Sequence, residues 1–317
     1  LHFVLLFIVI WAIGGASGLG VLERLAVLIT GALYFAQISH PNALELSHND
    51  DTTPEQVGKA VFSSLLYGPF ASSYPLVHDV HAATDDDPFS AASGESFYAY
   101  CLRVTIGSAR AGFAAENLRR AQTPPTGIAR FMHPYVGYVA SAGIALLVSM
   151  MIAGLGGLIA LLAVSALTQM QVLLRFYVRH FGLRRAQLAD GTFEPLGPQH
   201  NWGMTTRFSE ALMLFALRLV DDRTSTSEHI KDLLSDEAKS PKLPHAPMVM
   251  YALALAPPKW HAAMSADLGA QLPDQPEHDP FTKLSTQDEI MARVLASQKA
   301  DSVRPARPTR PAPMPGE

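Results

Sequence analysis

One long stretch without charge constrains the fold of this chain more than any other feature. From Tyr135 the sequence carries no Asp, Glu, Lys or Arg until Arg175, and it stays largely apolar to Val178. A helix rises about 1.5 Å per residue and crosses a bilayer in roughly 20 residues, so this stretch is too long for one crossing and suits two. The glycine-rich segment at residues 154–157 is the natural place for a break. The sequence therefore predicts a membrane hairpin over residues 135–180.

A second hairpin is predicted at the start of the chain, over residues 1–38. Residues 1–17 predict one membrane helix and residues 22–38 predict the return helix, with four glycines between residues 14 and 20. Leu1 already lies inside an apolar stretch, so we expect that further sequence precedes it. The composition favours a membrane protein, because 49% of the residues are hydrophobic and only 16% are charged.

The sequence between and after the hairpins is more mixed. Residues 39–134 contain two amphipathic segments, at 57–70 and 97–118, which suit the membrane surface better than a full crossing. Residues 181–270 predict a cap with helical and irregular structure. Residues 271–317 are rich in proline and charge and cannot bury enough apolar surface to fold alone. The predicted fold is all-α: a polytopic membrane bundle of about four spanning helices, with amphipathic surface helices and a cytoplasmic cap.

The basic side chains predict the orientation in the membrane. The tips of both hairpins carry almost no Lys or Arg, whereas the opposite side is rich in Arg, which the positive-inside rule places in the cytoplasm. The net charge of −4 is spread along the chain and gives no indication of a nucleic-acid partner. The single Cys101 cannot form an intrachain disulfide. The basic residues concerned are Arg103, Arg110, Arg119, Arg120, Arg130 and the cluster that begins at Arg175.

A motif lies at the end of the second predicted hairpin. It reads Phe176-Tyr177-Val178-Arg179-His180-Phe181-Gly182-Leu183-Arg184. This resembles the N-Y-x-E-H-Y-G-L-x-R box of the integral-membrane alkane hydroxylases (alkane 1-monooxygenases), relatives of the membrane fatty acid desaturases. The resemblance implies a helical bundle in which many histidines hold an iron pair on the cytoplasmic side. His180 keeps the histidine of the box, but Arg179 replaces its glutamate, and an arginine there opposes the charge of metal cations.

The first two histidine boxes of that family are present in outline. Leu44-Glu45-Leu46-Ser47-His48 stands in place of H-E-x-x-H, so His48 is kept and the first histidine has become Leu44. The run 83–90 resembles the V-A-T-x-x-D-P-x-S segment of the family, and counting back from it without a gap locates the next ligand positions. Those positions hold Pro69, Tyr74, His78 and Asp79.

Without the resemblance, the same region has another interpretation. His78-Asp79-Val80-His81, followed by Asp85, Asp86 and Asp87, is rich enough in donors to form a metal site of its own. A run of like charges is more typical of a solvated surface. The sequence therefore favours an acidic, solvated loop.

The fourth box departs furthest from the family. Residues 195–202 resemble its G-P-x-H-x-W segment, and the register continues without a gap to Arg218 and Asp221, which both match. The resemblance extends over roughly residues 40–265, and its specificity comes from the order and spacing of the boxes. In this region the ligand positions hold Thr206, Leu219, Asp222 and Arg223.

Three histidines, His48, His78 and His180, remain at ligand positions. They could hold a single iron or zinc, but they could not build the iron pair of the family. We therefore expect no metal cofactor. Apolar replacements such as Leu44 and Leu219 are expected to pack the region where the ligands are missing.

The leading hypothesis is a catalytically inactive relative of the alkane hydroxylases. It would be a structural or accessory subunit of a bacterial inner-membrane complex, in contact with membrane lipids and, through residues 271–317, with other membrane subunits. One alternative is a hydroxylase or oxygenase for alkane or fatty-acyl substrates, whose altered metal site uses the remaining histidines with Asp79 or Asp222. The other is a lipid-binding membrane protein that keeps a substrate channel without chemistry.

Overall fold

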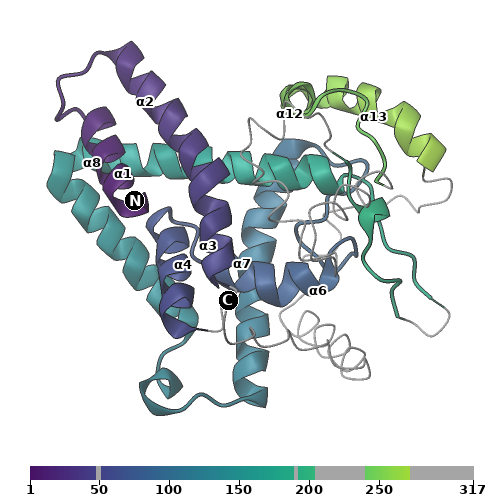
Figure 1. The fold of residues 1–317 in the computed structure, drawn as a ribbon, viewed down its shortest axis with the longest axis horizontal. Helices are drawn as coiled ribbons and strands as arrows, with labels where there is room; N and C mark the ends of the chain where they lie inside the picture. The colour runs from purple at the N-terminus through teal and green to yellow at the C-terminus, as the bar shows by residue number, and fades with distance from the viewer. Residues whose placement is uncertain (48–50, 189–191, 204–239, 272–317) are drawn as a thin grey trace, which may run out of the picture.

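The computed structural model describes the chain except for residues 48–50, 189–191, 204–239 and 272–317 (Figure 1). The regular elements of this described part are helices, joined by turns and two isolated β-bridges, so the predicted all-α class is confirmed. Two helical stretches, Val21–Ser47 and Pro134–His180, are long and apolar enough to cross a membrane. These features are those of a helical membrane bundle.

The N-terminal hairpin forms around the predicted glycine turn. Helix α1 (His2–Ile13) and helix α2 (Val21–Tyr34) pack against each other. In the turn, Gly15 and Gly18 adopt φ angles of 99° and 74°, a region that residues with a Cβ rarely enter. The first helix ends at Ile13 rather than near residue 17, and is shorter than a full crossing.

The return helix does not end at Ile38, where the sequence predicted its end. It continues through a π-helical turn, η1 (Phe35–Ser39), into α3 (His40–Ser47). The polar residues there are compatible with the helix because their side chains bond to its own carbonyls: the Asn42 amide donates to the Ile38 carbonyl oxygen at 2.6 Å. The first part of the predicted cytoplasmic segment is therefore an extension of the apolar helix.

Helix α8 (Pro134–His180) is the longest element and contacts α1, α2, α4, α7 and α12. Its backbone leaves helical geometry at Ala153 and at Gly154, where φ is 57° and ψ is −139°. This is the start of the segment at which the sequence predicted a break. The two arms of α8 diverge from this bend (Figure 1), and the N-terminal helices pack with residues of both arms, such as Ala145 and Leu161.

The glycine turns of the two hairpins meet at their tips. A Cβ built on Gly14 would lie 2.8 Å from the Cβ of Ala153, and one built on Gly156 would overlap the carbonyl oxygen of Gly14. The two backbones approach so closely that neither position has room for a side chain. Glycine at both turns is therefore required by packing as well as by conformation.

Between the hairpins, short helices pack around one long helix. Helix α4 packs against α3 and α8, and helix α7 packs against α5, η2 and α8. This arrangement brings residues 70–81 against the C-terminal arm of α8, where ring contacts join Phe70 and His78 to Phe176. The elements are α4 (Thr52–Ser64), α5 (Phe70–Ser73), the π-turn η2 (Tyr74–His78), α6 (Asp79–His81) and α7 (Phe97–Gln122).

The described part of the predicted cap closes over the end of α8. The indole Nε1 of Trp202 donates to the Phe181 carbonyl oxygen at 2.8 Å. The ring of Trp260 packs against Tyr177 and Phe181, with centroid distances of 5.3 and 5.0 Å. The remaining described helices are the 3₁₀ turns η3 (Gly127–Arg130) and η4 (Pro198–His200), and helices α12 (Pro247–Ala254) and α13 (Pro257–Gln271).

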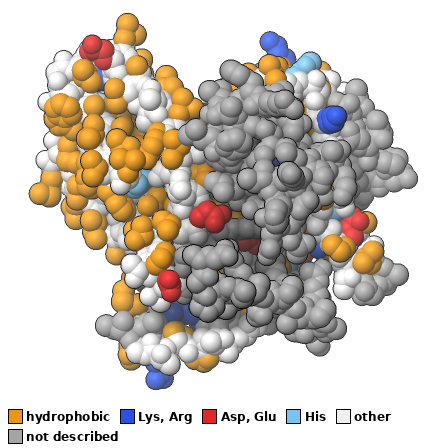
Figure 2. Space-filling model, viewed as in Figure 1, with side chains coloured by type: hydrophobic (Ala, Val, Ile, Leu, Met, Phe, Trp, Pro, Cys, Tyr) orange, Lys and Arg blue, Asp and Glu red, His pale blue; other side chains and the backbone are white. Residues whose placement is uncertain are grey.

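Apolar side chains cover the surface around α1, α2 and the bend of α8 (Figure 2). Leu22, Met151 and Leu155 are among the most exposed of them. Such a large apolar surface is unfavourable in water and favourable in lipid. It marks this end of the molecule as the part that lies in the membrane.

We expect Gly156→Ala to lower the melting temperature of the protein in detergent. The added methyl would overlap the Gly14 carbonyl oxygen, and overpacking of this kind costs about 1–3 kcal/mol. Gly143→Ala is the matched control in the same helix, because a Cβ there meets no atom within 4 Å. Equal melting temperatures for the two variants would contradict the packing of the two turns.

Candidate functional site

The residues that the sequence singled out converge where η2, the loop after α6 and the C-terminal arm of α8 meet. His78 and His180 are buried there, and their ring centroids lie 5.2 Å apart. Phe89 and Phe176 pack against both sides of His78, at 5.3 Å each. Two imidazoles are therefore adjacent, in a largely aromatic environment.

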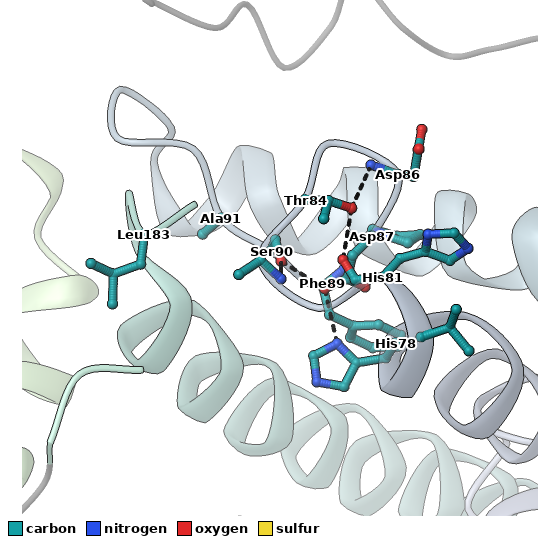
Figure 3. A network of polar contacts seen from close by, with 12 residues as sticks. His78, His81, Thr84, Asp86, Asp87, Phe89, Ser90, Ala91 and Leu183 are labelled. Carbon is teal, nitrogen blue, oxygen red and sulfur yellow. Dashed lines mark hydrogen bonds and ion pairs between the residues drawn. The ribbon is translucent and has the colours of Figure 1, made fainter. Parts of the chain in front are cut away.

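A buried carboxylate fixes one of these imidazoles. Asp87 Oδ2 lies 2.9 Å from His78 Nδ1 and also accepts a hydrogen bond from the Ser90 hydroxyl at 2.7 Å, while Oδ1 accepts from the Phe89 backbone N–H at 3.0 Å (Figure 3). Burial alone would raise the pKa of Asp87, but His78 and the hydrogen bonds from His78 and Ser90 lower it to about 2. Asp87 is thus an anion that orients His78.

The prediction of a solvated acidic loop is wrong. Asp87 is 2% exposed, and His78 and His81 are buried as well. The loop folds inward because its own side chains bond to its backbone: the Ser90 hydroxyl accepts from the Ala83 N–H at 2.8 Å. Asp79 and Asp85 stay exposed, and Asp85 forms an ion pair with Arg184 at 3.5 Å.

His180 occupies the last turn of α8 and faces a small cavity. Its ring stacks on Phe176, with planes 16° apart, and its Nδ1 has no hydrogen-bond partner in the described part of the chain. The cavity has a volume of about 30 Å³, enough for only one or two waters. Residues that line it include His78, His180, Tyr74, Asp79, Arg175 and Arg179.

Two guanidinium groups therefore lie beside the two imidazoles. Arg175 and Arg179 are one turn apart on α8, and both are buried. Arg175 Nη2 donates to the Ala36 carbonyl oxygen at 3.4 Å, while its Nη1 has no partner among the described residues. The fixed positive charge of this cavity disfavours another cation.

Comparison with known proteins identifies this arrangement. A profile of the fatty acid desaturase family matches residues 25–217, more than half of the chain. The chain belongs to the fatty acid desaturase family. The resemblance inferred from the motifs is thereby confirmed.

Three alkane 1-monooxygenases are similar to this desaturase-family chain. They are alkane 1-monooxygenase 2 and alkane 1-monooxygenase 1 of Pseudomonas aeruginosa, 27% and 28% identical over 71% and 84% of this chain, and alkane 1-monooxygenase of Acinetobacter baylyi, 28% identical over 70%. The matches cover 59%, 70% and 54% of these relatives. The chain thus spans only part of the length of the enzymes that it resembles.

Several ligand positions of the desaturase-family resemblance lie in the hydrophobic core. Leu44 and Tyr74 are fully buried and belong to the same apolar cluster as Phe62 and Phe70. Pro69 is the N-cap residue of α5 and carries no donor atom. The other positions, His48, Thr206, Leu219, Asp222 and Arg223, lie outside the described residues.

The described residues do not fit an iron pair. No group of three or more His, Cys, Asp or Glu within the described ranges is placed to hold a metal ion. Of the available donors, His78 Nδ1 bonds to Asp87 and leaves only Nε2 as a possible ligand atom, and aromatic rings pack against both histidines.

One buried histidine escaped the sequence analysis. His40 lies in a cage of rings, 4.6 Å from Phe70 and 5.1 Å from Phe62, and neither of its ring nitrogens has a hydrogen-bond partner in the described part. It follows the π-turn η1 directly, just as His78 ends the π-turn η2. π-Turns inside helices are frequent at functional sites, but no sequence pattern marks them.

We expect Asp87→Asn to destabilise the protein, because the variant loses the negative charge that His78 and Ser90 hydrogen-bond. Hydrogen bonds to charged groups contribute about 1.5–3 kcal/mol. Since the pKa of Asp87 is lowered from 3.8 to about 2, its contribution is complete above about pH 4 and is lost as the pH falls toward 2.

Thermal unfolding in detergent between pH 7 and pH 2 measures this effect. The difference between the unaltered protein and Asp87→Asn should shrink over the lowest part of that range. Asp86→Asn, one residue away and only partly buried, is the control and should change the melting temperature far less. A pH-independent difference would show that Asp87 acts through its shape rather than its charge.

Proposed function

We propose that this chain is a catalytically inactive member of the fatty acid desaturase family, and that it is a structural or accessory subunit of a bacterial inner-membrane complex. One observation carries the proposal: two of the described ligand positions of the alkane-hydroxylase resemblance are occupied by side chains that pack in the core, and a third by a proline. Leu44 and Tyr74 belong to the hydrophobic core, and Pro69 has no side-chain donor atom.

The electrostatics of the cavity support the same conclusion. Its lining combines Arg175 and Arg179 with the imidazoles of His78 and His180. Two guanidiniums in a buried site repel a metal cation strongly because the local dielectric constant is low.

The framework around this site is nevertheless kept. The bend of α8, the tryptophans that cap its end and the core around Phe70 form a well-packed bundle. A bundle that no longer needs to hold a cofactor can still present surfaces to other membrane proteins. The proline-rich residues 271–317, which lie outside the described part, are the segment that we propose as the docking arm, on the cytoplasmic side.

A second function has one specific observation in its favour. His180 Nδ1 is unpartnered and faces the same cavity as His78 and Asp79. An imidazole nitrogen and a carboxylate are ligands that iron and zinc accept. An oxygenase or hydroxylase with one metal ion, acting on an alkane or fatty-acyl substrate, is therefore the alternative.

Elemental mass spectrometry of the purified protein in detergent separates the two. We expect no stoichiometric iron or zinc. About one equivalent of metal that is lost in His180→Ala but kept in His245→Ala, an exposed control, would instead support the enzyme. An iron pair in each chain would contradict both proposals.

The accessory role makes a prediction about assembly. Native protein extracted in a mild detergent should elute as a complex larger than its monomer, because a subunit without chemistry needs partners. A chain that ends at Gln271 should lose that assembly while keeping its melting temperature, since the described core lies upstream of this residue. A full-length chain that is always monomeric by light scattering would contradict the role.

A further inference from the structure

A wide groove lies at the N-terminal end of helix α8, whereas His78 and His180 lie at its C-terminal end. It is formed by α4, the last turn of α7, the linker at residues 123–126 and the first turns of α8, and its volume is about 1080 Å³. That is at the upper end of the sizes typical for ligand sites. Helix α8 begins its charge-free run here, so the groove lies at the boundary between the membrane and the polar part of the chain.

Three basic side chains line this groove: Lys59, Arg119 and Arg120. The carboxylate of Glu55 lines it as well, and it is bonded to the Lys59 ammonium at 2.5 Å. Arg120 donates through Nη1 and Nη2 to the carbonyl oxygens of Met132 and Arg130, each at 3.1 Å. The groove therefore has a net positive lining whose charges are held in place.

Arg119 is held by a network that reaches into the protein core. Its Nε and Nη2 donate to Glu116 Oε2 at 3.0 and 2.7 Å, and the buried Glu116 accepts the Ser72 hydroxyl on Oε1 at 2.7 Å. Ser72 in turn bonds to the hydroxyl of Tyr138, which lines the groove. One edge of the guanidinium is thus fixed, and the side chain is still 51% exposed. A group oriented in advance loses little entropy when it binds an anion.

His133 adds a hydrogen-bond donor to the same groove. Its Nδ1 accepts from the Tyr135 N–H at 3.2 Å, so the neutral ring carries its proton on Nε2. Nε2 is buried and has no acceptor among the described residues, although the ring lines the groove. Burial lowers the pKa of His133, and Arg120 and Arg119 lower it further, whereas Glu116 raises it. The net effect is a lowered pKa, which keeps the imidazole neutral.

We propose that this groove binds one anionic phospholipid from the surrounding bilayer, with its phosphate between Arg119, Lys59 and His133. The bilayer boundary is where a lipid headgroup lies, and basic side chains there attract anionic lipids. The acyl chains would follow the neighbouring face of α8, where Val136 and Val139 are exposed. A free phosphate ion would fill only a small part of the groove, which is why the lipid is the assigned occupant.

Native mass spectrometry of the full chain in detergent, with added phosphatidylglycerol or phosphatidylcholine, tests the proposal. We expect the anionic lipid to bind more tightly. Glu116→Gln/Arg119→Gln should weaken it about tenfold, the effect of losing one charge-assisted contact of about 1.4 kcal/mol. Both charges are removed together because Glu116 alone would be an unpaired buried anion. Arg110→Gln, an exposed position on the same helix, is the control and should not change the binding.

A second variant tests the site if the paired substitution impairs folding. Gly137 lines the groove and a Cβ there meets no atom within 4 Å, so Gly137→Phe starts from open space and adds bulk to the groove wall. It should abolish preferential binding of phosphatidylglycerol.

Equal binding of the two lipids, or an equal loss in Arg110→Gln, would overturn the proposal. So would displacement of the lipid by millimolar glycerol 1-phosphate, which would mean that the groove takes a free phosphate. None of these results depends on whether the chain is a catalyst.

Discussion

The bend in α8 determines where the other parts of the molecule lie. A helix of this length cannot remain straight within a bilayer, and Gly154 supplies the backbone conformation that turns it. The N-terminal hairpin then fits between the two arms, with its own glycine turn against Gly156. One arm ends among the histidines and the other begins at the cationic groove. The backbone conformation of Gly154 thus separates the histidine cavity from the groove, although both are built on helix α8.

The buried carboxylates within the described part follow a consistent rule. The three buried carboxylates, those of Asp87, Glu95 and Glu116, each bond to a basic side chain: His78, Arg103 and Arg119. A buried charge without such a partner destabilises a protein by several kcal/mol. The pair of His78 and Asp87 has the form of the carboxylate contact that orients a metal-binding histidine. Packing in the aromatic core also requires the pair, because without Asp87 the His78 Nδ1 would lose its hydrogen-bond partner.

The sequence predicted the parts of the fold that depend on long-range averages of composition. The charge-free run and its glycines located the bend of α8 to within a residue, and the order of the boxes identified the family. It could not predict features that depend on individual contacts. The helix that begins as α2 continues past Ile38 because the Asn42 side chain bonds to a carbonyl oxygen of the same helix. Asp87 is buried because three hydrogen bonds outweigh the cost of removing its carboxylate from water. No sequence pattern marks His40 as a buried residue. The ligand positions at His48 and beyond Gly203 remain predictions.

The two ends of α8 show how the same residue types serve opposite purposes. At the C-terminal end, Arg175 and Arg179 are buried around a cavity of about 30 Å³, which is too small to admit a large ligand and too positive to favour a cation. At the N-terminal end, Arg119 is fixed along one edge by a buried network and borders a groove more than thirty times larger, about 1080 Å³ against about 30 Å³. A side chain that binds a ligand must be both held in one orientation and accessible to the ligand, whereas a structural side chain needs only the first. On this criterion, we propose that the groove at the membrane boundary, rather than the small cavity beside His180, is the recognition site of this chain.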